Sequence, residues 1–274
     1  MILAWASPAQ VAPAALSATL APSAIRQGRV ATLTILASVP VSRLTVRFAG
    51  RSWPLYRETN GAWRTILGTD PTTSAGRHTI TVEALTPAGA RLAVRRTLTV
   101  LRVVFPERRI TFDPERQALL TREAVEREQR RVNAALRVLH GERLWEEPFN
   151  QPVAGKVSSP YGVLSIYQGV TRGFHAGTDF PVPEGTPVQA ANHGIIRLAE
   201  ALPLSGNAVL IDHGMGVVTS YLHLSAINAT VGQRARKGDV IGAVGSTGLA
   251  TGPNLHWGLR VSTVRVDPMP WTRQ

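Results

Sequence analysis

Two histidines and one aspartate in the C-terminal half of the chain have the residue types and spacing of a metal site. His175 and Asp179 stand four residues apart in His175-Ala-Gly-Thr-Asp179, and His256 follows in Gly252-Pro-Asn-Leu-His256. Two imidazoles and one carboxylate form a typical ligand set for catalytic zinc, which keeps a fourth position open for water. Each side chain alone is more often a hydrogen-bonded structural residue, but their joint occurrence in Gly-rich stretches favours a Zn2+ site.

A further histidine could handle protons. His223 lies in the apolar stretch Tyr221-Leu-His223-Leu-Ser225, which is predicted to end a strand. Its side chain could act as a general base or stabilise a developing oxyanion. The alternative is a half-buried histidine whose ring is bonded to the backbone. His213, which lies in a strand-to-strand turn before Gly214, is interpreted as structural.

The composition favours a β-rich protein of one large or two small domains. The chain has 274 residues, 44% of them hydrophobic, with 24 Gly and 19 Pro, which indicates a real core and many turns. The absence of Cys excludes thiolate zinc ligands, disulfides and cysteine nucleophiles. No apolar run reaches the roughly 18 residues that a transmembrane segment needs.

The net charge of +12 is concentrated in the N-terminal third. Residues 15–102 contain twelve Arg but only three acidic residues, Glu58, Asp70 and Glu83. Because a basic surface attracts polyanions, we expect weak electrostatic binding of acidic polymers, including acidic wall polymers. The sequence lacks basic clusters interleaved with aromatic residues, which argues against a specific nucleic-acid partner.

Residues 15–104 are predicted to form an immunoglobulin-like β-sandwich. Alternating apolar residues at 31–37, 44–48, 78–84 and 92–100 indicate strands, separated by turn signals such as Asn60-Gly61. Strands at this spacing over about ninety residues are typical of such sandwiches, although the Cys pair is missing. Residues 1–14 are predicted to be a disordered start or a signal-peptide remnant, because Ala4-Trp5-Ala6 matches a cleavage site.

Residues 105–147 are predicted to be a helical linker. Asp113 can cap a helix that begins at Pro114, and apolar residues from Val125 to Leu139 recur at helical spacing. This pattern indicates an amphipathic helix or a helix pair that ends near Gly141. Strand patterns punctuated by Gly then return, so residues 148–274 are predicted to form a second, β-rich domain.

A series of motifs follows in fixed order through this second domain. They are Phe174-His-Ala-Gly-Thr-Asp-Phe180, Gly185-Thr-Pro-Val-Gln-Ala190, Gly206-Asn207, Ile211-Asp-His-Gly214, Tyr221-Leu-His-Leu-Ser225, Lys237-Gly238, Gly245-Ser-Thr-Gly248 and Thr251-Gly-Pro-Asn-Leu-His-Trp257. Together, residues from about 148 to 271 resemble the lysostaphin-type, LytM-like zinc endopeptidases, which cut peptide bonds in peptidoglycan. The resemblance implies a β-sheet groove with zinc at its floor. It also implies that His175, Asp179 and His256 are the ligands and that His223 is a catalytic histidine.

Two residues depart from this family pattern. Asn254 stands where the family has the first histidine of a His-x-His pair, and the Arg expected after the turn Ser159-Pro-Tyr-Gly162 is missing. As a second candidate catalytic residue, Asn254 can donate a hydrogen bond to an oxyanion or hold a water, but it cannot shuttle a proton near pH 7. Losing one acid–base group typically costs roughly 10²–10⁴-fold in rate.

The sequence therefore predicts a zinc metalloendopeptidase that acts outside the cytoplasm on peptide cross-links of peptidoglycan, with activity reduced by Asn254. The alternative is a non-enzymatic peptidoglycan-binding or regulatory protein that keeps the peptidase fold. Retention of all three ligands argues against this alternative, because a scaffold has no need to hold zinc. A third possibility is a polyanion-binding protein that acts through its basic N-terminal part.

Overall fold

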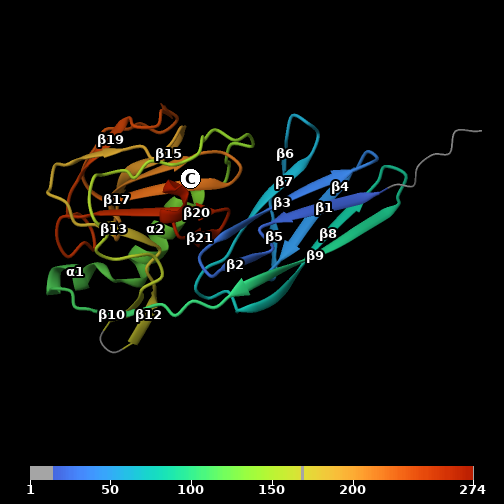
Figure 1. The fold of residues 1–274 in the computed structure, drawn as a ribbon. Coiled ribbons are helices and arrows are strands. Elements are labelled where there is room, and N and C mark those ends of the chain that lie inside the picture. The colour runs from blue at the N-terminus through green and yellow to red at the C-terminus, as the bar shows by residue number, and fades with distance from the viewer. Residues whose placement is uncertain (1–14, 168–169, 274) are drawn as a thin grey trace, which may run out of the picture.

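The computed structural model describes residues 15–167 and 170–273, so the expectation for residues 1–14 lies outside the described range. The chain consists mainly of strands, which confirms the predicted fold class at that level. Two N-terminal sheets lie beside a large C-terminal sheet, and a segment with two helices connects them (Figure 1). The longest helix has 14 residues, and no helix of the described chain is long and apolar enough to cross a membrane.

The two N-terminal sheets pack face to face around one core. One sheet has the order β1-β3-β7-β6 and contains β1 (Leu16–Ala21), β3 (Val30–Ala37), β7 (Trp63–Gly68) and β6 (Tyr56–Arg57). The other has the order β2-β9-β8-β4-β5 and contains β2 (Ala24–Arg26), β9 (Arg91–Leu101), β8 (Gly76–Leu85), β4 (Arg43–Phe48) and β5 (Arg51–Trp53). Alternate residues such as Leu33, Ile35, Ile80 and Val82 are fully buried between the sheets. This alternation explains why the period-two pattern located β3, β4, β8 and β9.

The C-terminal part is built on a nine-stranded antiparallel sheet. Its central order is β13-β20-β17-β16-β15-β18. The strands are β13 (Gly177–Phe180), β20 (Leu255–Val261), β17 (Val217–Ile227), β16 (Gly206–Asp212), β15 (Gly194–Leu202), β18 (Arg234–Ala235), β14 (Pro187–Gln189), β19 (Val240–Val244) and β21 (Val264–Val266). The short 3-10 helix η1 (Met269–Thr272) follows β21. Tyr221 and Trp257 are fully buried on one face of this sheet, and His256 and Leu222 lie on the other face.

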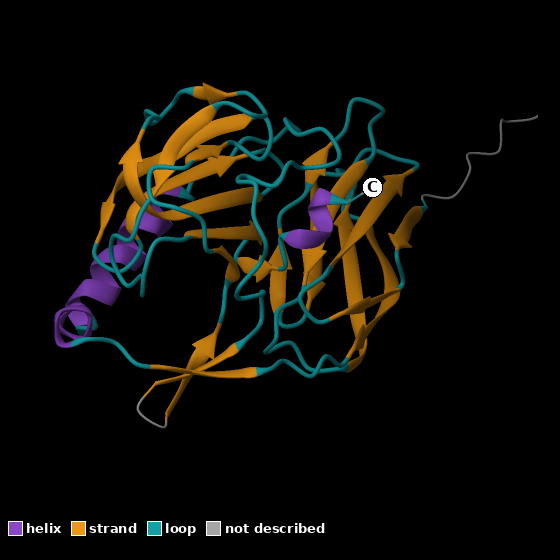
Figure 2. Cartoon of the chain, turned by 60° about the vertical axis from the view of Figure 1, so that its left-hand side comes forward, coloured by secondary structure: helices purple, strands orange, loops and turns teal. Residues whose placement is uncertain are grey.

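The connecting segment contains α1 (Pro114–Leu119) and α2 (Arg122–Ala135). The predicted cap is confirmed, because the Asp113 side chain accepts a hydrogen bond from the Arg116 backbone N–H at 2.8 Å. The predicted end near Gly141 is wrong: α2 ends at Ala135, and the chain then turns onto the sheet. Apolar residues of this segment pack on the faces of β15, β16 and β17, so α2 lies against the large sheet (Figure 2).

The structure adds a strand to the segment predicted as a helical linker. β10 (Glu107–Ile110) pairs in parallel with β11 (Leu164–Tyr167), which pairs with β12 (Val170–Phe174). Without β10, β11 would present an unpaired edge, and edge strands readily take such a partner. This pairing places the start of the connecting segment next to the C-terminal part of the chain.

The N-terminal sheets and the C-terminal sheet are joined by direct contacts and share a continuous core. The Tyr161 hydroxyl donates a hydrogen bond to the Arg265 carbonyl at 2.7 Å. The Asp267 N–H donates to the Gly28 carbonyl at 2.9 Å. At Gly28, a Cβ would lie 2.7 Å from the Tyr161 ring, so this contact requires glycine. The N-terminal sheets are therefore held beside β20 and β21.

Glu128 anchors α2 to the loop between β15 and β16. Its carboxylate accepts hydrogen bonds from the N–H groups of Leu204 and Ser205 at 2.7 and 3.1 Å, and from the Ser205 hydroxyl at 2.6 Å. Because Glu128→Ala leaves these donors without an acceptor, we expect it to lower the free energy of unfolding by about 1–3 kcal/mol. Urea denaturation measures the loss. The control is Glu123→Ala on the same helix, since Glu123 is exposed and has no side-chain partner among the described residues; equal losses in both variants would contradict the anchoring role.

Candidate metal centre

The strand register of the C-terminal sheet brings the candidate ligands together. β13 and β20 pair so that Asp179 lies directly opposite His256. Trp257 and Leu259 are buried, so the alternate side chain of His256 faces the open side of the sheet. His175 lies in the turn between β12 and β13. Three residues far apart in the sequence therefore share one face of the sheet.

The side chains of His175, Asp179 and His256 converge on one point. His175 Nε2 lies 3.0 Å from Asp179 Oδ1 and 3.0 Å from His256 Nδ1, and His256 Nδ1 lies 2.9 Å from Asp179 Oδ1. Each residue thus offers one ligand atom to a common centre. All three are half-buried, so the centre is sheltered but open on one side.

The hydrogen bonding of His175 tests whether this triangle suits a cation. His175 Nδ1 lies 3.0 Å from the Pro160 carbonyl, which can only accept, so Nδ1 carries the proton. In the neutral ring, Nε2 then presents a lone pair to Asp179 and His256. A proton on His256 Nδ1 can be donated fully to only one of its two neighbours. His175 Nε2 and Asp179 Oδ1 would then still face each other as two acceptors with no proton between them. A divalent cation resolves this conflict, and the ligand separations resemble the roughly 3.3 Å expected around tetrahedral zinc.

The charge states around the centre agree with metal binding. Burial raises the pKa of Asp179, but the neighbouring rings of His175 and His256 outweigh this effect and hold it well below its usual range. Burial lowers the pKa of His256, so its ring favours the neutral form that a metal requires. The carboxylate is therefore ionised and the His256 imidazole is neutral at physiological pH.

His223 stands beside the centre with one nitrogen free. Its Nδ1 lies 2.8 Å from the Thr247 carbonyl and therefore donates its proton there, and its ring centroid lies 6.2 Å from that of His256. Burial, and then the neighbouring His256, lower the pKa of His223 to about 4, so the ring is neutral. Its Nε2 has no partner among the described residues, so it presents a free lone pair to the cavity.

The backbone at His223 departs from regular strand geometry. The sequence indicated that His223 ends a strand, but it lies inside β17, where the pairing with β16 shifts register. His223 has a φ of 65°, which is uncommon for a residue with a side chain. Such local strain is often found at functional sites.

Asn254 lines the same cavity as the three candidate ligands and His223. Its side-chain amide donates a hydrogen bond to the Gly252 carbonyl at 2.8 Å. The predicted catalytic residues are therefore adjacent in space. His213, by contrast, is fully buried with hydrogen bonds at both ring nitrogens, as expected for a structural residue.

One wall of the metal cavity was not foreseen from the sequence. The cavity has a volume of about 370 Å³, and residues 108–112 line one side of it. Arg108 Nη1 lies 3.9 Å from Asp179 Oδ2. The alternation of Ile110 and Phe112 with polar residues is a weak strand signal, and nothing in it pointed toward the metal site.

We expect His175→Ala, Asp179→Ala and His256→Ala each to lose most of the bound metal, because the two remaining ligands cannot complete the site. Elemental analysis of purified, dialysed protein measures metal per chain. His78→Ala, which changes a histidine in the N-terminal sheets, is the control and should leave the metal content unchanged. Metal-free protein without any substitution, or full metal in all three variants, would contradict the assignment.

Gly177 lets the His256 ring sit close to β13. A Cβ at this position would lie 2.4 Å from the Trp257 carbonyl and 2.7 Å from His256 Nε2. We expect Gly177→Ala to displace His256 and to lower metal affinity by roughly 10–100-fold, as other changes around metal ligands do. Chelator competition measures the affinity. Gly252→Ala is the control, because a Cβ there meets nothing within 4 Å; unchanged affinity in Gly177→Ala would refute this account.

Residues 173–268 match the family described as Peptidase family M23. DD-carboxypeptidase/endopeptidase Mpg of Neisseria meningitidis serogroup B is 43% identical over 114 residues, which cover 42% of this chain and 26% of that protein. Peptidoglycan DD-endopeptidase ShyA of Vibrio cholerae serotype O1 is 44% identical over 95 residues, which cover 35% of this chain and 22% of that protein. The chain thus spans about a quarter of the length of these relatives.

A solved structure from Pseudomonas aeruginosa that is assigned to peptidase M23 is similar over most of the chain. The match covers 90% of this chain and 93% of that one, with 28% identity and a TM-score of 0.63. The likeness in fold therefore extends from the C-terminal sheet into the N-terminal sheets. Together with the family match, it shows that residues 173–268 form a domain of peptidase family M23.

Proposed function

We propose that the protein is a zinc-dependent endopeptidase that hydrolyses peptide bonds in bacterial cell-wall peptidoglycan. The observation that carries this proposal is the triangle of ligand atoms beside the free Nε2 of His223, in one open cavity. The similar proteins of Neisseria and Vibrio are named as peptidoglycan or DD-specific peptidases, which supports a cell-wall hydrolase. Peptidoglycan lies outside the cytoplasm, so we also propose an extracytoplasmic location.

The residues of the cavity have different roles in the proposed reaction. His175, Asp179 and His256 would hold the ion, which when bound supplies a Lewis acid and lowers the pKa of water. His223 accepts the proton of the attacking water at Nε2, since the Thr247 carbonyl holds Nδ1–H and keeps the ring oriented. The same nitrogen then returns the proton to the leaving amine.

Asn254 contributes without transferring a proton. One N–H of its amide is bonded to the Gly252 carbonyl, and the group has a second N–H that can stabilise an oxyanion. An amide cannot replace a histidine as acid or base, so we propose that turnover is slower than it would be with a histidine at this position. The alternative, a non-enzymatic peptidoglycan-binding or regulatory protein, gives no reason for three converging metal ligands.

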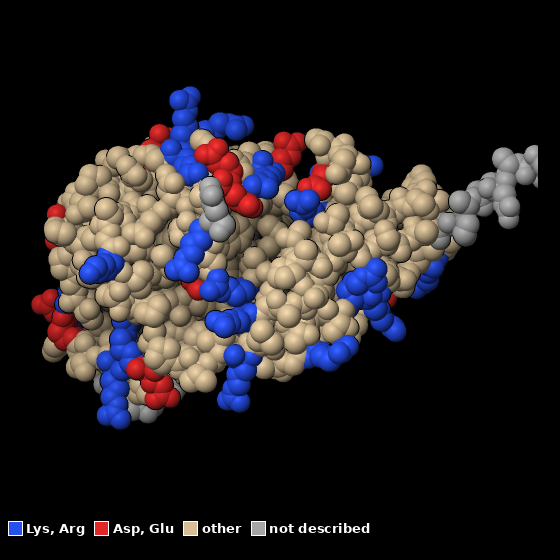
Figure 3. Space-filling model, viewed as in Figure 1, with Lys and Arg blue, Asp and Glu red and all other residues tan. Residues whose placement is uncertain are grey.

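The N-terminal sheets support a separate binding role. Their strand orders, β1-β3-β7-β6 and β2-β9-β8-β4-β5, match an immunoglobulin-like division into an ABED sheet and an extended GFC sheet, so we propose that residues 15–104 form such a domain. Basic side chains are spread over these sheets, with few acidic ones among them (Figure 3). We propose that this surface binds acidic wall polymers weakly, while residues 105–147 link it to a peptidase domain of residues 148–274.

The decisive experiment measures peptide release from whole peptidoglycan. We expect His223→Ala to abolish release and to keep its metal, because His223 is not a ligand. Asn254→His should raise the rate by roughly 10- to 100-fold, within the usual range for one acid–base group.

Metal content and folding of both variants serve as controls. A regulatory protein would release no peptide in any form, and neither substitution would then change anything. An unsubstituted protein that matches Asn254→His in rate would show that a second histidine is dispensable.

A further inference from the structure

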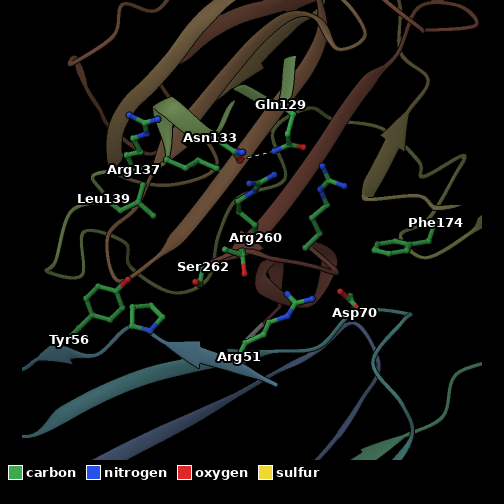
Figure 4. Close-up of a pocket in the computed structure, with 14 residues that line it drawn as sticks. Arg51, Tyr56, Asp70, Gln129, Asn133, Arg137, Leu139, Phe174, Arg260 and Ser262 are labelled. Carbon is green, nitrogen blue, oxygen red and sulfur yellow. Dashed lines mark hydrogen bonds between the residues drawn. The ribbon is translucent and has the colours of Figure 1, made fainter. Parts of the chain in front are cut away.

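A second cavity lies where the N-terminal sheets, α2 and β20 meet, and it is rich in arginine. It has a volume of about 700 Å³, within the range of small-ligand sites. Four arginines and one acid line it, and these are Arg51, Arg137, Arg260, Arg265 and Asp70. Figure 4 shows Arg260 near its centre, with Arg51 reaching up from the N-terminal sheets and Gln129 and Asn133 facing it from α2.

None of the four guanidinium groups has an ion pair or hydrogen bond with another described residue. Asp70 supplies one negative charge but forms no ion pair with them, and its Oδ1 accepts hydrogen bonds from the backbone and hydroxyl groups of Thr72 and Thr73. Four positive charges and one negative charge therefore leave a net charge of +3 around the cavity.

Arg260 and Arg265 are held together against their mutual repulsion. They lie directly opposite each other on β20 and β21, a position where like charges are destabilising. Burial, and then Arg265, lower the pKa of Arg260 to about 10, so the group stays charged at physiological pH. Arg260 is half-buried, Arg265 is exposed, and neither guanidinium has a partner among the described residues. An incoming anion would stabilise such a repulsive pair.

The arginine cavity and the metal cavity are connected along β20. His256 and Arg260 lie on the same face of this strand, four residues or about 13 Å apart. A third hollow between α2 and the sheet lies between them. It shares His256 with the metal cavity and shares Gln129, Arg260 and Arg265 with the arginine cavity. An extended peptide bound at the metal could therefore reach the arginines.

We propose that the arginine cavity binds a carboxylate of the peptide substrate and so selects peptides that carry an acidic group about 13 Å from the bond to be cut. This inference rests on the proposed function, because the peptide must lie across the metal centre. The guanidinium fork binds a carboxylate through two parallel hydrogen bonds, which gives both affinity and orientation. Arg51 brings the N-terminal sheets into substrate recognition.

The test compares a peptide of the peptidoglycan stem that has a free terminal carboxylate with the same peptide as its terminal amide. Binding is measured by calorimetry on the full chain in the His223→Ala background, so that the peptide is not consumed. We expect the acid to bind roughly 10- to 100-fold more tightly than the amide, as charge-assisted hydrogen bonds predict. Arg260→Gln should remove this preference.

Arg51→Gln should reduce the same preference, and because Arg51 is an exposed residue of the other sheets, its loss does not disturb β20. Arg91→Gln removes an equal charge from an exposed strand residue that does not line the cavity, and it should change nothing. Equal affinities for acid and amide, or a preference that survives Arg260→Gln, would overturn the proposal. Tight binding of inorganic phosphate without any preference for the acid would instead identify a phosphate-bearing polymer as the ligand and would also overturn it.

Peptidoglycan hydrolysis by the unsubstituted protein is measured separately. An acid preference that depends on Arg260 supports the proposed role of the arginine cavity even where no peptide is released. The lack of peptide release would then contradict only the proposed enzymatic function. Peptide release without an acid preference would contradict only the proposed role of the arginine cavity.

Discussion

The candidate metal centre depends on three electron-rich atoms held about 3 Å apart. Two imidazole nitrogens and one carboxylate oxygen at such distances repel each other unless protons or a cation lie among them, and one shared proton relieves only part of this repulsion. The pairing of β13 with β20 sets Asp179 against His256, and the Pro160 carbonyl fixes the tautomer of His175. A shift of one residue in this register would turn the ligands to opposite faces of the sheet. The sheet therefore places two of the three candidate ligands, and the turn that leads into β13 places the third, His175.

A second group of mutually repelling atoms, positively charged in this case, lies farther along the same face of β20. His256 joins a cluster of acceptors at one end of the strand, and Arg260 faces the like charge of Arg265 at the other. A ligand of opposite charge would stabilise each cluster. The core on the other face of β20, with Trp257 and Leu259 fully or nearly fully buried, supplies the rigidity that tolerates both. The docking of α2 and of the N-terminal sheets turns this face into a groove with walls.

The sequence predicted the parts of the structure that follow from short-range pattern. Alternation located strands such as β3 and β8, and the residues Asp113 and Pro114 marked the start of α1. The candidate metal ligands could be predicted because two imidazoles and a carboxylate in Gly-rich stretches form a typical zinc ligand set, and the structure brings these three side chains together. The sequence could not reveal β10, because its pairing with β11 depends on a contact between segments more than fifty residues apart. The arginine cavity could not be predicted for the same reason. An excess of positive charge in the composition does not indicate which four side chains lie close together. Arg51 comes near Arg260 only because the N-terminal sheets pack against the C-terminal part.

The proposed function accommodates Asn254 at a position where the family pattern has a histidine, because the three candidate metal ligands do not include this residue. Hydrolysis of a peptide bond needs one proton taken from water and one given to the leaving amine, and a single group can do both in turn. His223 is suited to this proposed role, since its Nδ1–H is donated to the Thr247 carbonyl and its Nε2 has no partner among the described residues. Asn254 is held by Gly252 and can stabilise charge without competing for the proton. Under the proposed function, an asparagine in place of a histidine at this position removes a second proton carrier and leaves the three candidate ligands in place. Its effect would then fall on the rate of turnover and not on the binding of the metal.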